Sequence, residues 1–141
     1  IALEIEQNTE TILYSDPVRI SNVFKQVLKN ALDYIDLNKP FSYLKVQIHL
    51  TKDHVILECK DNGLGVDKNY IDNIFSMFYR ASEKSIGSGL GLYIAKEILT
   101  KLDSTINLDS ELGLGTTVRM EIKNEKGTFL TIKTDSSSDI H

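Results

Sequence analysis

The order of helix-like and strand-like patterns along the chain is the feature that most constrains its fold. Apolar residues recur at three- and four-residue intervals over residues 20–35 and 90–102, which predicts two helices with one buried face each. Apolar and polar residues alternate over residues 43–50 and 54–60, which predicts an antiparallel strand pair. Helices and strands do not alternate one by one, as they would in a doubly wound sheet. We therefore expect an α+β, two-layer sandwich, with a mixed, mostly antiparallel sheet of about five strands covered by about three helices.

Shorter signals predict the remaining elements. Asp16 and Pro17 predict the start of the first helix, because Asp accepts hydrogen bonds from free backbone N–H groups and Pro suits the first helical position. The helical pattern ends near Pro40, and one domain is expected over residues 1–123. The other expected elements are two short strands within residues 1–14, a helix over residues 66–80, and strands at residues 105–108 and 116–123. In the segment 124–133, residues 128–133 are expected to form an optional extra hairpin strand, and residues 134–141 a disordered tail.

Composition excludes several functional classes. Of 141 residues, 41% are hydrophobic and 26% charged, with a net charge of -4, which is typical of one globular domain and argues against a general nucleic-acid-binding surface. The single cysteine, Cys59, rules out a disulfide framework, and no apolar run has the ~20 residues of a membrane span. His49 and His54 lack the neighbours of a metal site. Because the chain begins at Ile1 without Met or a signal-like segment, we expect a fragment of a longer protein.

The first predicted helix carries a polar stripe beside its apolar face. At ~100° per residue, Gln26 and Asn30 share this stripe, and Asn30 lies at the border of the apolar face, where it can face a pocket. A solvated face made of Asn22, Gln26 and Asn30 explains the same pattern without any function. The stripe alone does not choose between these two interpretations.

A carboxylate is expected to point into the core at the end of the second predicted strand. Val55, Leu57 and Cys59 mark the buried face of this strand, and Asp61 shares their parity. A buried carboxylate is costly unless donors surround it, so Asp61 either caps the following turn or binds a ligand that carries a donor. Residues 61–65 read Asp-Asn-Gly-Leu-Gly, which also fits an ordinary turn without a function.

Two further glycine-rich segments flank predicted elements. Residues 87–92, Gly-Ser-Gly-Leu-Gly-Leu, open the second long helix, whose free N–H groups can receive phosphate oxygens. They match neither the P-loop nor the Rossmann glycine pattern. Residues 113–115, Gly-Leu-Gly, precede a strand in which Thr116 shares the inward parity of Val118, although a plain hairpin turn accounts for this segment as well.

Taken together, the four polar and glycine-rich segments occur in a specific order. Asn30, Asp61-x-Gly63-x-Gly65, Gly87-x-Gly89-x-Gly91 and Gly113-x-Gly115-Thr116 resemble the N, G1, G2 and G3 boxes of the ATP-binding catalytic domain of sensor histidine kinases. That domain is related to gyrase-type, heat-shock-chaperone and mismatch-repair ATPases. Residues 74–80, Ile-Phe-Ser-Met-Phe-Tyr-Arg, look like the F box. The resemblance covers about residues 1–123 and implies the Bergerat ATP-binding fold.

The resemblance implies a role for each matching position. Asp61 would accept a hydrogen bond from the adenine amine, Thr116 would support it, and Gly63 and Gly65 would let the base approach the chain. Tyr34 would pack on the adenine. Asn30 would be a ligand of Mg²⁺. The phosphates would be held by the backbone of Gly89, Leu90, Gly91 and Leu92, under a lid formed by residues 81–88. Arg80 or Lys84 would supply positive charge at the γ-phosphate. Gln26 would orient the attacking group, since an amide cannot act as a base.

The implied function is histidine phosphorylation in two-component signal transduction. The domain would bind Mg-ATP and pass the γ-phosphate to a histidine of a dimerisation domain in the same parent chain, and thence to a response-regulator Asp. The parent would be a homodimer with this domain in the cytoplasm and an optional membrane anchor, and neither nucleic acid nor the membrane surface would be a direct partner. No histidine here lies in an acceptor-like helix, and Asp33 replaces a usual basic residue. Two alternatives stay open: a nucleotide-dependent scaffold module with weak catalysis, and an anti-sigma-type serine kinase.

Overall fold

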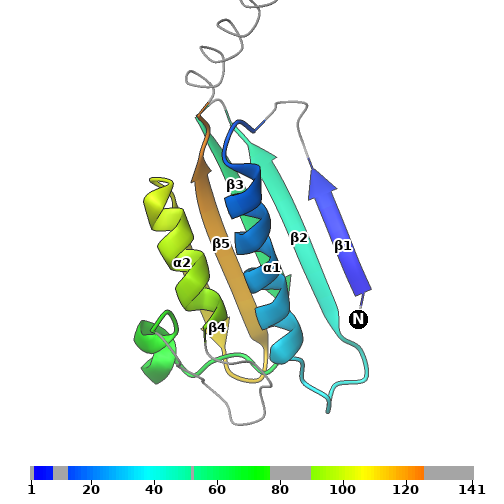
Figure 1. Cartoon of the computed structure of the whole chain (residues 1–141). Helices are drawn as coiled ribbons and strands as arrows, with labels where there is room; N and C mark the ends of the chain where they lie inside the picture. Colours follow the sequence, from blue (N-terminus) through cyan, green and yellow to red (C-terminus); the bar gives the residue numbers. More distant parts are fainter. Residues whose placement is uncertain (1, 8–12, 52, 77–89, 126–141) are drawn as a thin grey trace, which may run out of the picture.

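The described residues form one five-stranded mixed sheet with helices on one face (Figure 1). The computed structural model describes residues 2–7, 13–51, 53–76 and 90–125. The strand order is β1-β2-β3-β5-β4, in which β1 pairs in parallel with β2 and every other pair is antiparallel. The strands are β1 (Ala2–Gln7), β2 (Tyr43–Leu50), β3 (His54–Asp61), β4 (Thr105–Glu111) and β5 (Gly115–Lys123). This mixed, mostly antiparallel sheet confirms the predicted fold class.

Two α-helices lie side by side across the sheet, and a short 3-10 helix flanks them (Figure 1). They are α1 (Pro17–Asp33) and α2 (Gly91–Lys101), and the 3-10 helix is η1 (Lys68–Asn73). Asp16 caps α1, because its carboxylate accepts hydrogen bonds from the N–H groups of Val18 and Arg19, both at 3.1 Å. The predicted start of the first helix is therefore confirmed. None of the described helices is long and apolar enough to cross a bilayer.

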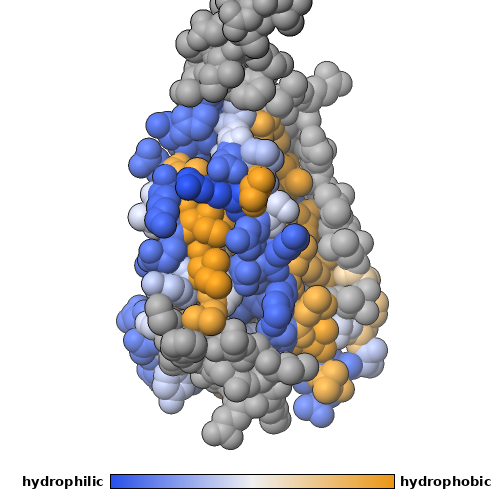
Figure 2. Space-filling model, viewed as in Figure 1, coloured by the Kyte–Doolittle hydropathy of each residue, from blue (hydrophilic) through white to orange (hydrophobic). Residues whose placement is uncertain are grey.

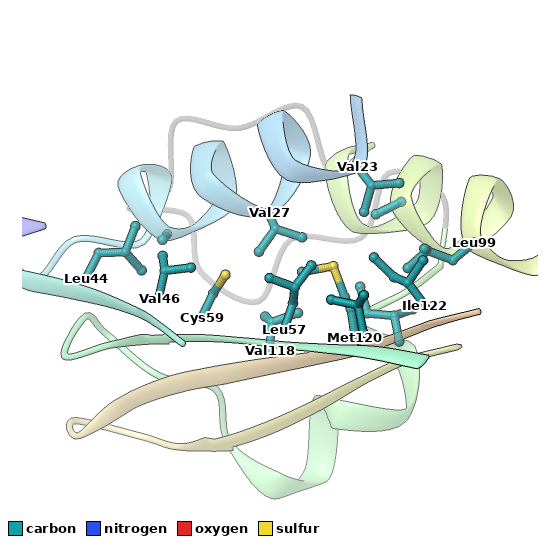
Figure 3. Packing of buried hydrophobic residues seen from close by; sticks show 14 residues of the cluster. Val23, Val27, Leu44, Val46, Leu57, Cys59, Leu99, Val118, Met120 and Ile122 are labelled. Carbon is teal, nitrogen blue, oxygen red and sulfur yellow. The ribbon is translucent and has the colours of Figure 1, made fainter. Parts of the chain in front are cut away.

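The hydrophobic core lies between the two α-helices and the sheet. Figure 3 shows Val23 and Val27 of α1 pointing toward Leu57, Val118 and Met120 on the strands. The core-facing strand positions alternate with polar ones, as period-two patterning requires. On the opposite side of the helix layer, hydrophilic side chains cover most of α1 and α2, with apolar side chains visible between and beside them (Figure 2). Each helix thus buries one stripe and leaves the other in solvent.

Several predicted boundaries were wrong. The first helix ends at Asp33 and not near Pro40. The N–H of Tyr34 makes the last (i, i−4) bond, to the carbonyl of Asn30, and the N–H of Ile35 bonds instead to the carbonyl of Leu32, three residues back. The Asp36 carboxylate accepts from the N–H of Asn38 at 3.0 Å, a local bond that competes with helix continuation. β4 extends to Glu111, three residues past the predicted end, and β3 includes Asp61.

Within the described part of the helix expected over residues 66–80, which is residues 66–76, the helical structure is the 3-10 helix η1. Asp67 caps η1 through the N–H of Asn69, at 2.9 Å, and Ile74 and Phe75 follow outside it. Residues 1–14 hold β1, while Leu13 and Tyr14 lie outside any strand. The remainder of both predictions, the optional strand at 128–133 and the tail at 134–141 lie outside the described residues.

Candidate functional site

Asp61 places a carboxylate at the end of β3, on the buried face, as the alternation predicted. Its side chain is only 7% exposed, and its Oδ1 accepts hydrogen bonds from the N–H groups of Gly63 at 2.9 Å and Thr116 at 3.2 Å. Among the described residues, none donates a hydrogen bond to Oδ2. Burial raises the pKa of Asp61, and the two backbone donors and the Lys39 charge lower it in part. Asp61 therefore caps its turn with one oxygen, and a ligand at the other oxygen stays a prediction.

Thr116 lies beside Asp61 at the start of β5, also with its side chain inward. Its Oγ1 is 2.8 Å from the hydroxyl of Ser110, the residue opposite it on β4. Ser110 also accepts from the N–H of Val66 at 2.8 Å and lies 2.9 Å from the carbonyl oxygen of Gly115. The sequence reasoning found Thr116 but missed Ser110, although Ser110 shares the inward parity of Ile106 on its strand.

Lys39 is a second residue that the sequence reasoning missed. Its ammonium donates to the backbone carbonyls of Asn62 at 2.7 Å and Gly63 at 3.3 Å, and thereby ties the loop after α1 to the loop after β3. The Asn62 amide adds two bonds, to the N–H of Tyr43 and the carbonyl of Phe41. No local sequence pattern marks Lys39, because its contacts are with residues 23 and 24 positions away.

The glycines after Asp61 are required by the protein's own backbone. A Cβ atom on Gly63 would lie 2.2 Å from the carbonyl oxygen of Tyr34, and one on Gly65, which has φ +68°, would lie 2.0 Å from that of Glu111. Gly115 is backed in the same way by the carbonyl of Asp61, at 2.1 Å. These close approaches explain the glycines without a ligand, so a role for Gly63 and Gly65 in receiving a base stays a prediction.

Asn30 of α1 and Tyr34, the residue after its end, line a small cavity together with Thr116. This cavity of about 10 Å³ is lined by Asn30, Tyr34, Val66, Ile74, Leu108 and Thr116, and its size would admit about one water molecule. The side-chain amide of Asn30 forms no hydrogen bond with any described residue, and it is only half-buried. The prediction that Asn30 faces a pocket is confirmed, and its role as a metal ligand stays a prediction.

Gln26 lies one turn before Asn30 and contacts the start of α2. Its Nε2 donates to Asn22 at 3.2 Å, and a Cβ atom on Gly91 would lie 3.4 Å from its Oε1, which is ordinary contact. The N-cap of α2, Leu90, makes no side-chain capping bond, which leaves the first N–H groups of α2 without that partner. The side chain of Leu92 is buried against Val66 and Ile74, so only its backbone can meet a ligand.

Asp33 pairs with a neighbouring lysine on the same helix. Lys29 Nζ lies 2.8 Å from its Oδ2, in an (i, i+4) pair whose lysine is mostly exposed. The acidic residue is therefore partly neutralised within α1. Arg80, Lys84 and Gly89, with the segment 81–88, lie outside the described residues, so their predicted roles stay predictions.

A known protein family matches the part of the chain that contains these site residues. A family model described as "Histidine kinase-, DNA gyrase B-, and HSP90-like ATPase" matches residues 15–126, which include Asn30, Asp61 and Thr116. The chain belongs to this family. It is an ATPase-type domain of the kind found in sensor histidine kinases, which confirms the resemblance inferred from the ordered boxes.

Individual relatives point to sensor kinases. The chain is 33% identical over 106 residues to the sensor histidine kinase YvrG of Bacillus subtilis, a match that covers 72% of this chain and 18% of YvrG. It is 35% identical over 122 residues to the sensor protein kinase WalK of Staphylococcus saprophyticus, covering 80% of this chain and 19% of WalK. The chain thus spans about a fifth of each of these two relatives.

A solved structure shares the fold. The mycobacterial sensor histidine kinase MprB superimposes with a TM-score of 0.72 at 23% identity, over 86% of this chain and 80% of that structure's chain. At this identity the similarity shows the fold alone. It is the ATP-binding fold that the ordered sequence boxes implied.

Proposed function

We propose that this chain is the ATP-binding catalytic domain of a sensor histidine kinase. It would bind Mg-ATP and donate the γ-phosphate to a histidine on a dimerisation domain of the same parent chain, for later transfer to a response-regulator Asp. The observation that carries the proposal is the buried Asp61, whose Oδ1 is held by two backbone N–H groups while Oδ2 has no donor among the described residues. Such an oxygen is suited to an exocyclic amine.

The other described residues support nucleotide binding around that carboxylate. Tyr34 and Thr116 line the small cavity, which would have to open to receive the base, and the uncapped start of α2 offers backbone N–H groups to phosphate oxygens. The described residues contain no cluster of three or more His, Cys, Asp or Glu side chains that would hold a metal by itself. This fits Mg²⁺ bound mainly by phosphates and water, with the free Asn30 amide as its protein ligand. Mg²⁺ would neutralise charge on the phosphates during transfer.

Transfer of the γ-phosphate would require little acid–base catalysis by the protein. The acceptor imidazole is already a nucleophile, so Gln26 would orient it by hydrogen bonding and would not remove a proton. Arg80 and Lys84 would contribute positive charge at the γ-phosphate. The parent chain would act as a homodimer, with this domain on the cytoplasmic side whether or not the parent is anchored in a membrane.

Asp61→Asn tests the nucleotide site most directly. The substitution keeps an oxygen that can accept from the backbone of Gly63 and Thr116 and converts the free oxygen into an amide donor, which would repel the adenine amine. We expect ADP affinity, measured by calorimetry, to fall by roughly tenfold to a hundredfold. Asp109→Asn, an exposed carboxylate on β4, is the matched control and should leave the affinity unchanged. Equal affinity in the Asp61→Asn chain and the wild type would refute the adenine assignment.

Phosphotransfer requires a separate experiment, because the acceptor is a second domain. The chain is mixed with γ-³²P-labelled ATP and the dimerisation domain of a related sensor kinase, and the label is tested for acid lability. Acid-labile, base-stable label on the acceptor supports a histidine kinase. Nucleotide binding without label would favour a scaffold module, and acid-stable label on a serine would favour a serine kinase of the anti-sigma type.

A further inference from the structure

Ser110 forms the centre of a buried hydrogen-bond cluster beside the proposed base site. Its hydroxyl lies within 2.9 Å of three groups: the N–H of Val66, the carbonyl oxygen of Gly115 and the hydroxyl of Thr116. The residue is 6% exposed, as is Thr116, so water does not readily compete for these bonds. The three partners belong to the loop after β3 and to the start of β5, and Ser110 joins both to β4.

The chemistry of the three partners determines the direction of each bond. The N–H of Val66 can only donate, and the carbonyl of Gly115 can only accept. A serine hydroxyl has a single proton, so Ser110 donates its one hydrogen bond to the carbonyl oxygen of Gly115. If that proton pointed at Thr116 instead, two acceptor oxygens would face each other at 2.9 Å without a hydrogen between them. The arrangement that satisfies all three contacts has Thr116 donating its own proton to Ser110.

We propose that Ser110 is a positioning residue. It accepts a hydrogen bond from the Thr116 hydroxyl, so that the Thr116 oxygen can only accept a hydrogen bond from the pocket. Asp61 Oδ2 is also an acceptor, so this end of the site requires a hydrogen-bond donor on the ligand. A water molecule that bridged the two oxygens would donate both of its hydrogens to the protein and present only lone pairs. Ser110 thereby selects for a base with an exocyclic amine over one with a carbonyl at the same position. The inference rests on the proposed nucleotide-binding function.

The test compares ADP with inosine diphosphate, which differs by an oxygen in place of the amine and by a proton on the ring. Both affinities are measured by calorimetry for the wild type and for Ser110→Ala. Without Ser110, the Thr116 hydroxyl can rotate and donate to the inosine carbonyl. We expect the ratio of ADP affinity to inosine diphosphate affinity to fall by about three- to tenfold, the equivalent of one neutral hydrogen bond.

Ser104→Ala is a matched control for the structural cost of the substitution. Ser104 is also buried, donates to the carbonyl of Leu102 and accepts from the N–H of Lys123, both at 3.0 Å, but it precedes the opposite end of β4 and has no hydroxyl partner among the described residues. Its loss should lower thermal stability and leave the nucleotide ratio unchanged. In a Thr116→Val background, Ser110→Ala should have no further effect on the ratio.

Two results would overturn the proposal: an unchanged ratio in Ser110→Ala, whether or not both affinities fall equally, or the same ratio change in Ser104→Ala. If Ser110→Ala does not fold, Ser110→Cys keeps most of the volume with a poor hydrogen-bonding group, and it should shift the ratio in the same direction. A wild-type chain that binds neither nucleotide would instead refute the proposed function, which separates the two failures.

Discussion

The two ends of the proposed site are held in different ways. At the base end, Asp61, Ser110 and Thr116 are buried, and their bonds join β3, β4, β5 and a loop across up to 55 positions of sequence. On the polar stripe of α1, Gln26 bonds to Asn22 within the same helix, and Asn30 bonds to no described side chain. The base end is therefore organised before a ligand arrives, whereas the stripe on α1 offers side chains whose partners would be the phosphates, the metal or another domain. The following predictions test this contrast, in order of decreasing effect.

The largest effect concerns Cys59, in the core next to Asp61. Burial, together with the nearby Asp61 charge, raises the pKa of the Cys59 thiol to about 12. At pH 8 the thiolate is then about a thousandfold rarer than for a free cysteine, so alkylation should be slower by at least about that factor. Mass spectrometry of the native chain over time measures the rate. A cysteine introduced by Asn22→Cys on the exposed stripe should react at a normal rate, and rapid labelling of Cys59 would show that the base end opens readily.

The next effect is expected from Asn30→Ala. Removing the free amide should leave thermal stability nearly unchanged, because no described residue bonds to it, and should weaken Mg²⁺-dependent ATP binding by roughly tenfold. Calorimetry with and without Mg²⁺ separates the metal-dependent part. Asn22→Ala, on the same stripe two turns earlier, is the control. Unaltered Mg²⁺ dependence in Asn30→Ala would remove Asn30 from the metal site.

Asp61 should contribute to function at the expense of stability. Because burial raises its pKa in the folded chain, the folded state favours the protonated form, so the free energy of unfolding rises as pH falls through the folded pKa toward the ordinary value of 3.8. Asp61→Asn should abolish this contribution and raise stability at pH 7 by about 1 kcal/mol. Urea unfolding of both chains between pH 4 and pH 8 measures the difference in their free energies of unfolding. A lower stability of Asp61→Asn at pH 7 would contradict this account.

The smallest effect is expected from Lys39→Met. The substitution removes the bonds to the carbonyls of Asn62 and Gly63 and the positive charge that lowers the pKa of Asp61. ADP affinity should fall by about two- to fivefold, and its decline in acid should begin at a higher pH, because Asp61 takes up a proton earlier. Lys39→Arg keeps the charge and should retain the acid limb of the wild type. An identical pH profile in Lys39→Met would show that the lysine acts on the loop alone.

Much of the fold followed from local patterns. Period-two alternation located β2 within its true bounds and placed Asp61 and Thr116 on the inward face, and Asp16 with Pro17 located the start of α1. The end of α1 was predicted wrongly, because Asp36 accepts a local bond from the backbone of Asn38 that competes with a regular helix. Asp67 caps a helix as a sequence pattern would suggest, but the described part of that helix is the 3-10 helix η1. Lys39 and Ser110 were not found, since each acts through contacts with residues far away in sequence.

The sequence by itself determined the kind of domain and the identity of its principal groups. Strand parity requires Asp61 to point inward, helical periodicity places Asn30 at the edge of a buried face, and the ordered boxes identify the family. The tertiary structure decided what each group is free to do. Only the packing of β3, β4 and β5 assigns Asp61 Oδ1 to two backbone donors and leaves Oδ2 without a donor among the residues that the structure describes. Only the contact of Ser110 with Val66, Gly115 and Thr116 sets the direction of a hydroxyl bond. The physical reason is that a hydrogen bond depends on the distance and the donor or acceptor character of both partners, and distant partners meet only in the folded chain.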